Sequence, residues 1–455
     1  MSEIYQKQKA YFASGKTLDV RWRIQQLQSL YDLILKKEKD ITDALYADLG
    51  KSKEESQMSE IGMVLSEITH MKKHLKSYTS RHFVTSPLAQ FPSLSYEMAV
   101  PYGNVLIMSP WNYPFLLTID PLVCAIAAGN TAVLKPGPDS PSVNRVMKEI
   151  IEELYDESYV CLVEGGIETA QILLDDPFDL IFFTGSTTTG QKIYESAARH
   201  LTPVILELGG KSPCIVDETA DIALAAKRIV FGKYLNCGQT CVAPDYILVH
   251  RSVHDQLIRE MKKQIISQYG DDPMSSSWYG KIINRRHFTR LVSLMDEIKI
   301  VHGGKIDENR LKIEPVIMDN VTWSDQVMQE DIFGPILPVL TYDDFDALIS
   351  SLQDKPNPLA LYLFTKNKAH QRIVDQKLRY GGGCINDTII HLASTSLGFG
   401  GTGESGIGKY HGRYGFEAFS HVKSIVDKKC WLDLPMRYAP YKNKLYNRLI
   451  RLFLR

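Results

Sequence analysis

Two short stretches of the sequence contain residue types that carry covalent chemistry. The first is the turn Asn236-Cys-Gly-Gln-Thr-Cys241, which follows a helical pattern and precedes the strand-like run 246–250. The second is Leu206-Glu-Leu-Gly-Gly-Lys211, where a carboxylate stands beside a Gly-Gly turn. A cysteine at a break between elements is partly exposed, as a nucleophilic thiol must be, and a nearby carboxylate can act as a general base toward a thiol or a water. Cys241 and Glu207 are therefore a candidate nucleophile and base, against the commoner case of an inert core cysteine.

The side-chain amide of Asn112 is a candidate donor to an oxyanion. An acyl-type reaction at sulfur needs hydrogen-bond donors where negative charge develops. The segment Ser109-Pro-Trp-Asn-Tyr-Pro114 follows a short apolar run, and its prolines hold Asn112 rigidly at the end of that run. The alternative is an asparagine that only caps a turn.

The sequence predicts no metal site. Cys237 lies four residues before Cys241, but no second Cys/His pair stands nearby, as a zinc site would require. His391 and His411 also lack partners at ligand spacing, and we expect both to be structural.

A cofactor with phosphate groups is indicated by a loop and a lysine. The loop consists of Gly185, Ser186, Thr187, Thr188, Thr189 and Gly190. It joins a strand-like run to a helical pattern, where free N–H groups and the helix dipole favour an anion. Its spacing is not G-x-G-x-x-G and it lacks a G-K-[ST] ending, so by itself it is equally a tight turn. Lys135, before Pro136, is placed to donate to a ribose or phosphate; the alternative is an ordinary solvent-exposed lysine at the end of a strand.

Strand-like and helical segments alternate from Gly103 onward, which is typical of a doubly wound α/β fold with ligands at the carboxyl ends of its strands. In the first half the predicted strands are 104–109, 131–135, 160–164 and 180–184, and the predicted helices are 120–128, 142–154, 168–174 and 190–200. The alternation starts afresh after Leu208 with strand 212–216, helix 220–231, strand 246–250 and helix 253–268. The sequence therefore predicts two α/β units.

The remaining segments differ in character. Residues 1 to about 80 predict helices, with Ile24, Leu27, Tyr31 and Ile34 forming one apolar stripe, and 60–76 predicts a further helix. Prolines interrupt 83–102, which suits an exposed hairpin that pairs with a partner subunit. The glycine-rich run 398–408 predicts a loop. The tail from Lys442 is a basic amphipathic helix, which either lies on a membrane surface or, as we favour, docks on its own fold or a partner.

Composition excludes several classes of protein. The 455 residues contain 44% hydrophobic and 23% charged residues, as expected of a globular chain. A net charge of -1 gives no support for binding to nucleic acid. The polar N-terminal segment lacks the apolar core of a signal peptide, and the seven scattered cysteines indicate the reducing cytoplasm.

Together, these motifs resemble those of the aldehyde dehydrogenase superfamily, and most closely its class 3 branch, which oxidises fatty and aromatic aldehydes. The resemblance covers about residues 20 to 430. Its motifs are Pro110-Trp-Asn, Phe183-Thr-Gly-Ser, Leu206-Glu-Leu-Gly-Gly-Lys-Ser, Gly238-Gln-Thr-Cys, Glu330-Asp-Ile-Phe-Gly-Pro and Phe399-Gly-Gly. The class 3 likeness rests on 236–246, Asn386-Asp-Thr-Ile-Ile-His391, Lys409-Tyr-His-Gly412 and Arg437-Tyr-Ala-Pro-Tyr441.

The resemblance implies a role for each matching position. Cys241 would form a thiohemiacetal and then a thioester, Asn112 and the Cys241 N–H would hold the oxyanion, and Glu207 would activate the hydrolytic water. The cofactor would be NAD and/or NADP, which accepts the hydride. Its implied contacts are Trp111, Lys135, the loop Gly185 to Gly190, Glu330 and Phe333.

The resemblance also implies an aldehyde dehydrogenase-like architecture, with a Rossmann-like cofactor domain, a catalytic domain and a small oligomerisation arm. The cofactor domain would comprise 1–82 and 103–208 with part of 397–420, and the catalytic domain 209–396. The arm would comprise 83–102 and 418–430, followed by the tail 431–455, and a homodimer is expected.

Two departures from the family pattern and two alternative functions remain. The usual Lys-Pro-Ser-Glu is Lys135-Pro-Gly-Pro138 here, so the glutamate that disfavours a 2′-phosphate is missing and we expect NADP to be used alongside NAD. The usual Leu-Pro-Phe-Gly-Gly is Leu397-Gly-Phe-Gly-Gly401 here, with glycine in place of proline.

A CoA-acylating dehydrogenase or acyl reductase is the alternative enzyme, and the presence of Glu207 argues against it. A non-catalytic structural protein on the same fold is disfavoured by the joint presence of the candidate nucleophile, base and oxyanion donor.

Overall fold

A six-stranded sheet forms the centre of the first α/β unit. In this computed structural model, which describes residues 2–454, the strand order is β17-β7-β6-β3-β4-β5, and all neighbours are parallel except β17 and β7. The strands are β3 (Asn104–Ser109), β4 (Thr131–Pro136), β5 (Val160–Leu162), β6 (Leu180–Thr184), β7 (Val204–Glu207) and β17 (Gly406–Ile407). Every residue of β3 and β4 is buried, which explains their continuous apolar runs. The carboxyl ends of β4, β6 and β7 meet at one edge, which carries Lys135, Thr184 and Glu207.

The helices of this unit are α6 (Leu116–Ala128), α7 (Pro141–Leu154), α8 (Ile167–Leu174) and α9 (Thr187–Ala198). We expected the first of them to begin at residue 120, but it begins at Leu116. The carboxylate of Glu60 accepts hydrogen bonds from the N–H groups of Phe115 and Leu116 at 2.9 and 3.1 Å. These are donors that the first turn of a helix leaves free, so a residue distant in sequence extends the helix.

The N-terminal helices pack against this unit, with α2 and α5 against α6 and α3 against α7. They are α1 (Glu3–Ala13), α2 (Val20–Lys36), α3 (Glu38–Leu49), α4 (Lys53–Ser56) and α5 (Gly62–Tyr78), with a π-helical turn η2 (Gln57–Ile61) before α5. The buried side of α2 includes Leu27, Leu30 and Ile34. Of the predicted apolar stripe, Leu27 and Ile34 are buried, whereas Ile24 and Tyr31 are only partly buried.

A seven-stranded sheet forms the second unit, in the order β10-β13-β14-β9-β8-β15-β16, with only β10 and β13 antiparallel. Its strands are β8 (Pro213–Val216), β9 (Tyr246–His250), β10 (Ile300–His302), β13 (Val316–Met318), β14 (Ile336–Tyr342), β15 (Ala360–Phe364) and β16 (Gly382–Ile385). Its helices are α10 (Ile222–Tyr234), α11 (His254–Tyr269), α12 (Arg285–Ser293), α13 (Phe345–Gln353) and α14 (Lys368–Lys377), and β11 (Ile306–Asp307) pairs with β12 (Lys312–Ile313). The predicted α/β class is confirmed.

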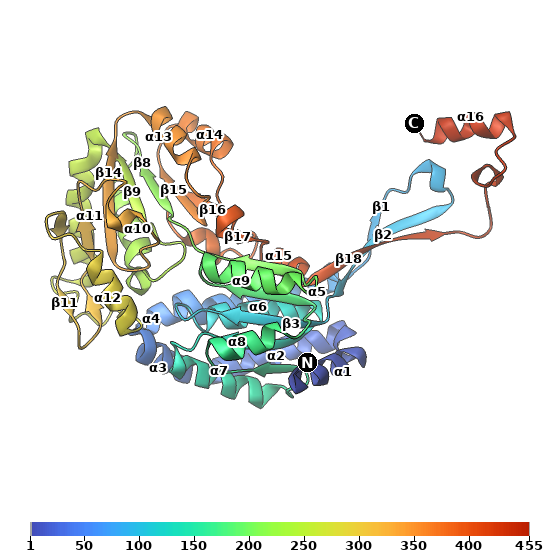
Figure 1. Ribbon diagram of the computed structural model, residues 1–455, viewed down its shortest axis with the longest axis horizontal. Helices are drawn as coiled ribbons and strands as arrows, with labels where there is room; N and C mark the ends of the chain where they lie inside the picture. Colours follow the sequence, from blue (N-terminus) through green and yellow to red (C-terminus); the bar gives the residue numbers. More distant parts are fainter. Residues whose placement is uncertain (1, 455) are drawn as a thin grey trace.

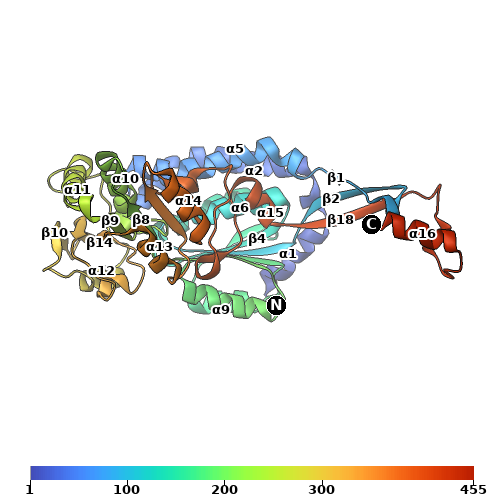
Figure 2. The same cartoon turned by 90° about the horizontal axis from the view of Figure 1, so that it is seen from above.

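A three-stranded arm projects from the first unit (Figures 1 and 2). It consists of β1 (His82–Val84), β2 (Ser93–Pro101) and β18 (Ser420–Lys428), and β2 pairs with β18 along its whole length. The terminal helix α16 (Lys444–Phe453) lies beyond it and packs on η3 (Leu88–Gln90). Among residues 2–454, no helix is long and apolar enough to cross a bilayer.

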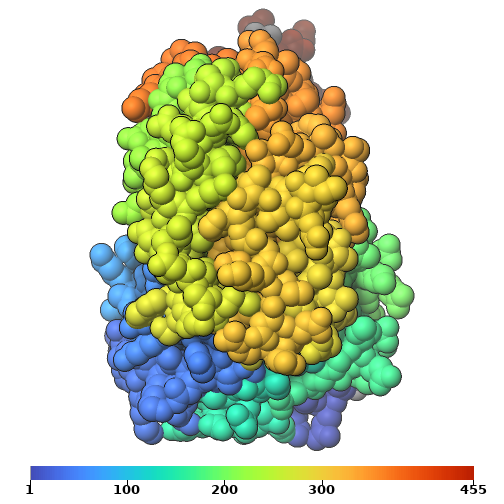
Figure 3. Space-filling model, turned by 90° about the vertical axis from the view of Figure 1, so that its left-hand side faces the viewer, coloured from blue at the N-terminus to red at the C-terminus, as the bar shows by residue number. Residues whose placement is uncertain are grey.

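The two units meet where the chain crosses between them. It leaves the first sheet at β7, enters the second at β8, and returns through the glycine-rich loop to add β17 beside β7. On the face shown in Figure 3, the second unit lies against the N-terminal helices. The carboxyl edge of the first sheet therefore opens toward the second unit, as the predicted ligand position requires.

Candidate active site

A sharp reversal of the chain presents Cys241. After α10, Asn236, Cys237 and Gly238 have φ values of 51°, 52° and 73° in succession. A Cβ atom on Gly238 would lie 2.2 Å from the carbonyl oxygen of Gly334, so only glycine permits this approach. The reversal buries Cys237 and leaves Cys241 partly accessible. The two cysteines of this turn therefore differ in exposure, and only Cys241 is accessible to a ligand.

Cys241 lines an almost wholly apolar cavity of about 150 Å³. The other lining residues are Met58, Ser59, Met63, Tyr113, Leu116, Leu117, Phe231, Leu235, Thr240, Ile389, Ile390, Leu392, Ala393, Phe399, Tyr410 and His411. They come from η2 and the start of α5, from α6 and the segment before it, from α10 and the cysteine turn after it, and from the loops after β16. An aldehyde with an apolar tail would therefore meet the thiol without contacting a charged wall.

Glu207 ends β7 and is buried, with no hydrogen-bond partner on either carboxylate oxygen among the described residues. Burial raises the pKa of this carboxyl well above its ordinary value. A Cβ atom on Gly400 would lie 3.1 Å from Glu207 Oε1, so the glycine-rich loop closes over the carboxyl group. An unpartnered carboxyl at this position has its oxygens free for a water or a thiol.

Cys241 and Glu207 are close enough to influence each other electrostatically. Burial first, and the charge of Glu207 second, raise the pKa of the Cys241 thiol to about 12. The main-chain N–H groups of Cys241 and Val242 act in the opposite direction and lower the pKa of the thiol. Burial and the neighbouring carboxyl group favour the protonated thiol, so attack by Cys241 on a carbonyl would require a base or solvent to take its proton.

The Asn112 amide lies against the cysteine turn. Its Nδ2 donates to the carbonyl oxygen of Gln239 at 3.0 Å, and the residue is 2% exposed. An amide nitrogen carries two N–H groups, so the second remains for a ligand. The carbonyl oxygen of Asn112 accepts from Asn236 Nδ2 at 2.8 Å, which ties the two segments together.

Trp111 and Phe333, both predicted cofactor contacts, meet across the two units with ring centroids 5.7 Å apart. His287 also packs on Trp111, at 4.8 Å. Glu330 does not join this group, because its side chain is 58% exposed and accepts from Arg290 Nη1 at 2.9 Å. The structure thus brings the two rings together and holds Glu330 at the surface.

The loop after β6 has the features of a site for a phosphate. Ser186 caps α9, and its side chain accepts the N–H of Thr189. The N–H groups of Thr187 and Thr188 lie at the open end of this helix, where an anion is favoured. A Cβ atom on Gly190 would lie 2.5 Å from Leu208 Cδ2, so glycine allows the helix to pack closely on the sheet.

Lys135 completes this edge of the sheet. It is 5% exposed, its Nζ donates to the carbonyl oxygen of Pro136 at 2.9 Å, and burial lowers the pKa of its ammonium group. Thr184 Oγ1, at the end of β6, is buried and has no partner among the described residues. An ammonium group, a free hydroxyl and an open helix N-terminus fit a nicotinamide dinucleotide, which presents ribose hydroxyls and a diphosphate.

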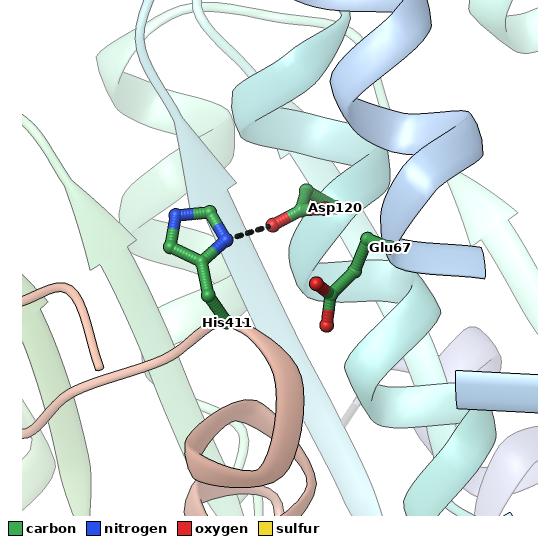
Figure 4. A group of neighbouring side chains, drawn as sticks. All are labelled: Glu67, Asp120 and His411. Atoms are coloured by element: carbon green, nitrogen blue, oxygen red, sulfur yellow. Dashed lines mark ion pairs between the residues drawn. The ribbon is translucent and has the colours of Figure 1, made fainter. Parts of the chain in front are cut away.

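His411 belongs to a buried group that the sequence did not reveal. Its Nδ1 lies 3.0 Å from Asp120 Oδ2, and Glu67 is the third member of the group (Figure 4). Glu67 Oε1 accepts the N–H of Gly412 at 2.7 Å, and the Tyr410 ring stacks on His411 at 4.1 Å. The group anchors the cavity wall formed by Tyr410 and His411. The partners come from α5 and α6, so spacing along the chain could not identify them.

Other supporting residues also went unpredicted. Arg290 holds Glu330 and donates to the carbonyl oxygens of Asp331 and Ile332. The buried pair Lys51 and Glu60 contacts the segment that contains Asn112. A lysine and a glutamate within a helical pattern normally indicate a solvated face, so only their burial distinguishes them.

Comparison with known proteins adds an independent finding. The model of the aldehyde dehydrogenase family matches residues 1–425. The chain is similar to the 4,4'-diaponeurosporen-aldehyde dehydrogenase of Staphylococcus aureus, with 49% identity over 96% of this chain and 95% of the relative. It is also similar to the dimeric NADP-preferring aldehyde dehydrogenase of Canis lupus familiaris, with 41% identity over 98% of this chain and 99% of the relative. The solved structure described as the substrate-bound state of Staphylococcus aureus AldH has a TM-score of 0.98 and 47% identity, and the match covers 100% of both chains.

Proposed function

Because the chain belongs to the aldehyde dehydrogenase family and catalyses the NAD(P)-dependent oxidation of aldehydes to carboxylic acids, we propose that the reaction passes through a covalent intermediate on Cys241. The observation that carries this proposal is the thiol itself, which faces an apolar cavity and lies beside the buried carboxyl group of Glu207, whose oxygens have no hydrogen-bond partner within residues 2–454.

In the first step, the sulfur of Cys241 bonds to the carbonyl carbon, and its proton passes to Glu207 or to solvent. The carbonyl oxygen becomes an oxyanion, which accepts hydrogen bonds from the second Asn112 N–H and from the Cys241 N–H. Donors of this kind are each worth about 100- to 1,000-fold in rate. The product of this step is a thiohemiacetal.

The nicotinamide cofactor, when bound, supplies the acceptor for the hydride that leaves this carbon. Lys135 and the loop Gly185 to Gly190 would hold its ribose and phosphate groups, and Trp111 and Phe333 would flank its nicotinamide end. Glu330 would reach it after release from Arg290. Loss of the hydride leaves a thioester on Cys241.

In the last step, Glu207 removes a proton from a water as the water attacks the thioester carbon. The carbon–sulfur bond breaks, the thiol is restored and the carboxylic acid leaves. Burial raises the pKa of the Glu207 carboxyl, so its ionised form is a stronger base than an exposed glutamate. Thiolysis by CoA does not need this group, so hydrolysis is favoured over the CoA-acylating alternative.

The substrate class we propose is medium to long aliphatic or aromatic aldehydes. An apolar cavity of about 150 Å³ can hold a molecule the size of benzene, and a longer chain would extend toward the mouth. Hexanal, decanal, benzaldehyde and succinic semialdehyde, each assayed with NAD and with NADP, test this class. The anionic succinic semialdehyde is expected to give the lowest kcat/KM, and a preference for it would contradict the proposal.

The decisive variant is Cys241→Ala. It is expected to abolish aldehyde oxidation and to retain cofactor binding, whereas Cys237→Ala, the matched control in the same turn, keeps its activity per folded molecule. Appreciable activity in Cys241→Ala would refute the mechanism. Product analysis in the presence of CoA separates the alternatives, since we expect free acid and no acyl-CoA.

We also propose that the protein is a cytoplasmic homodimer assembled through the arm. A nucleophilic thiol persists in a reducing compartment. The arm exposes Phe83, Leu94, Val422 and Val426, which a second copy would cover. Light scattering should give about twice the 51.5 kDa of one chain, and a monomeric mass would contradict the dimer.

A further inference from the structure

A fully buried ion pair lies behind the proposed oxyanion donor. Lys51 and Glu60 are both 0% exposed, and Lys51 Nζ lies 2.5 Å from Glu60 Oε1. Burying two charges is costly even when they pair. The contacts of this pair beyond each other therefore indicate why it is there.

Lys51 reaches the backbone of the oxyanion donor. Its Nζ donates to the carbonyl oxygen of Asn112 at 3.0 Å and lies 3.8 Å from the centroid of the Tyr113 ring. The Tyr113 hydroxyl lies 2.6 Å from Thr240 Oγ1, and Thr240 precedes Cys241. One cation thus contacts the donor segment and, through Tyr113, the turn that carries the nucleophile.

Glu60 holds the other end of the same segment. While Oε1 binds Lys51, Oε2 accepts the N–H groups of Phe115 and Leu116. The pair therefore restrains residues 112–116 at both ends, at the carbonyl of Asn112 and at the start of α6.

The remaining contacts leave Asn112 little freedom. Asn236 Nδ2 donates to the carbonyl oxygens of Asn112 and Gln239 at 2.8 and 3.2 Å, and its N–H donates to Glu55 Oε1 at 2.7 Å. Asn112 Nδ2 donates to the same carbonyl of Gln239. With its carbonyl oxygen held by two donors and one side-chain N–H engaged, the direction of the other N–H is set by this network.

We propose that Lys51, supported by Glu60, is a positioning residue that aims the free N–H of Asn112 at the oxyanion formed on Cys241. The inference rests on the proposed function, in which Asn112 is an oxyanion donor. Lys51 does not line the cavity, so any effect on the reaction passes through the residues that it holds, and its direct hydrogen bond is to the carbonyl oxygen of Asn112. Because the oxyanion exists only after attack, loss of Lys51 should lower kcat and leave the KM for the aldehyde nearly unchanged.

The test removes both charges together. K51M alone would leave Glu60 as an unpaired buried charge and threaten folding. K51M/E60Q is neutral and keeps a side-chain oxygen for the N–H groups of Phe115 and Leu116. The matched control is K148M/E164Q, which removes an exposed pair with an N···O distance of 3.2 Å.

We expect K51M/E60Q to keep its melting temperature within a few degrees and its affinity for NAD, and to lose about ten- to a hundredfold in kcat, less than the loss of a whole oxyanion donor. The control should keep kcat. A folded K51M/E60Q with wild-type kcat would overturn the inference. If this variant does not fold, K51L/E60Q, which also lacks the donor to the carbonyl oxygen of Asn112, takes its place with the same expected loss of kcat.

A double-mutant cycle with Asn112→Ala separates the two levels of the proposal. If Lys51 acts through Asn112, K51M/E60Q changes kcat by less than about threefold in the Asn112→Ala background. An equal loss in both backgrounds would overturn the positioning role and leave the role of Asn112 intact. No loss of kcat in Asn112→Ala alone would overturn the oxyanion role itself, and with it the premise.

Discussion

Replacing Glu67 by glutamine is expected to stabilise the protein at pH 8 and to change its stability little at pH 5. Burial first, and the charge of Asp120 second, raise the pKa of the Glu67 carboxyl to about 8. In the unfolded chain this carboxyl has its ordinary pKa of about 4.3. Between these values the folded protein holds a proton that the unfolded chain has lost, so the free energy of unfolding decreases as pH rises.

The magnitude follows from the two pKa values. Each pKa unit corresponds to about 1.4 kcal/mol, so Glu67 should cost the protein about 3 to 4 kcal/mol in unfolding free energy between pH 5 and pH 8. In E67Q the amide oxygen still accepts the N–H of Gly412, and the amide N–H replaces the carboxyl proton beside Asp120. The variant cannot ionise, so it should escape this loss.

The assay is thermal unfolding of wild type and E67Q at pH 5, 6, 7 and 8. The difference in melting temperature should grow toward pH 8, reaching roughly 5 °C by the size scaling of unfolding entropy. E152Q, an exposed glutamate on α7, is the control and should show a constant small difference. A gap between E67Q and wild type that is the same at pH 5 and pH 8 would refute the reasoning.

Three further variants address the reaction. E207Q should release one equivalent of NADH and then turn over slowly, with an acyl adduct on Cys241 visible by mass spectrometry; steady-state turnover at the wild-type rate would contradict the role of Glu207 in hydrolysis. A393W, at an exposed position of the cavity wall, should raise the KM for decanal about tenfold, a cost of about 1.4 kcal/mol. The KM for propanal should stay nearly unchanged, and an equal rise in KM for both aldehydes would place the residue elsewhere on the substrate path. P138E restores the glutamate of the family pattern, which disfavours a 2′-phosphate, so it should lower kcat/KM with NADP about tenfold relative to NAD; an unchanged ratio of kcat/KM for the two cofactors would mean that this position does not contact the ribose.

Much of the fold could be predicted because it depends on local patterns. The apolar runs that became β3 and β4 are buried on both faces, so their sequences alone indicate parallel strands. The start of α6 could not be predicted in this way. Its first N–H groups are bound by Glu60, which lies more than fifty residues earlier in the chain, and a capping signal normally lies next to the helix that it caps.

The predicted site residues also divide into those that local sequence identifies and those whose position depends on distant packing. Cys241, Glu207 and Asn112 were identified by residue type, by the turns that hold them and by a family resemblance. Glu330 was predicted as a cofactor contact, but its exposed position on Arg290 depends on how α12 packs beside the loop before β14. Its part in cofactor binding remains a proposal.

By itself, the sequence determined two α/β units, the aldehyde dehydrogenase resemblance, and the thiol, carboxyl and amide expected to act in catalysis. These follow from periodicity, glycine and proline positions, and residue types, all of which are properties of short segments. Only the tertiary structure decided that His411 pairs with Asp120 beside Glu67, and that Lys51 and Glu60 are buried behind Asn112. Whether a charged side chain faces solvent or a buried partner depends on the packing of helices far apart in the chain, and burial is what turns an ordinary lysine or glutamate into part of the site.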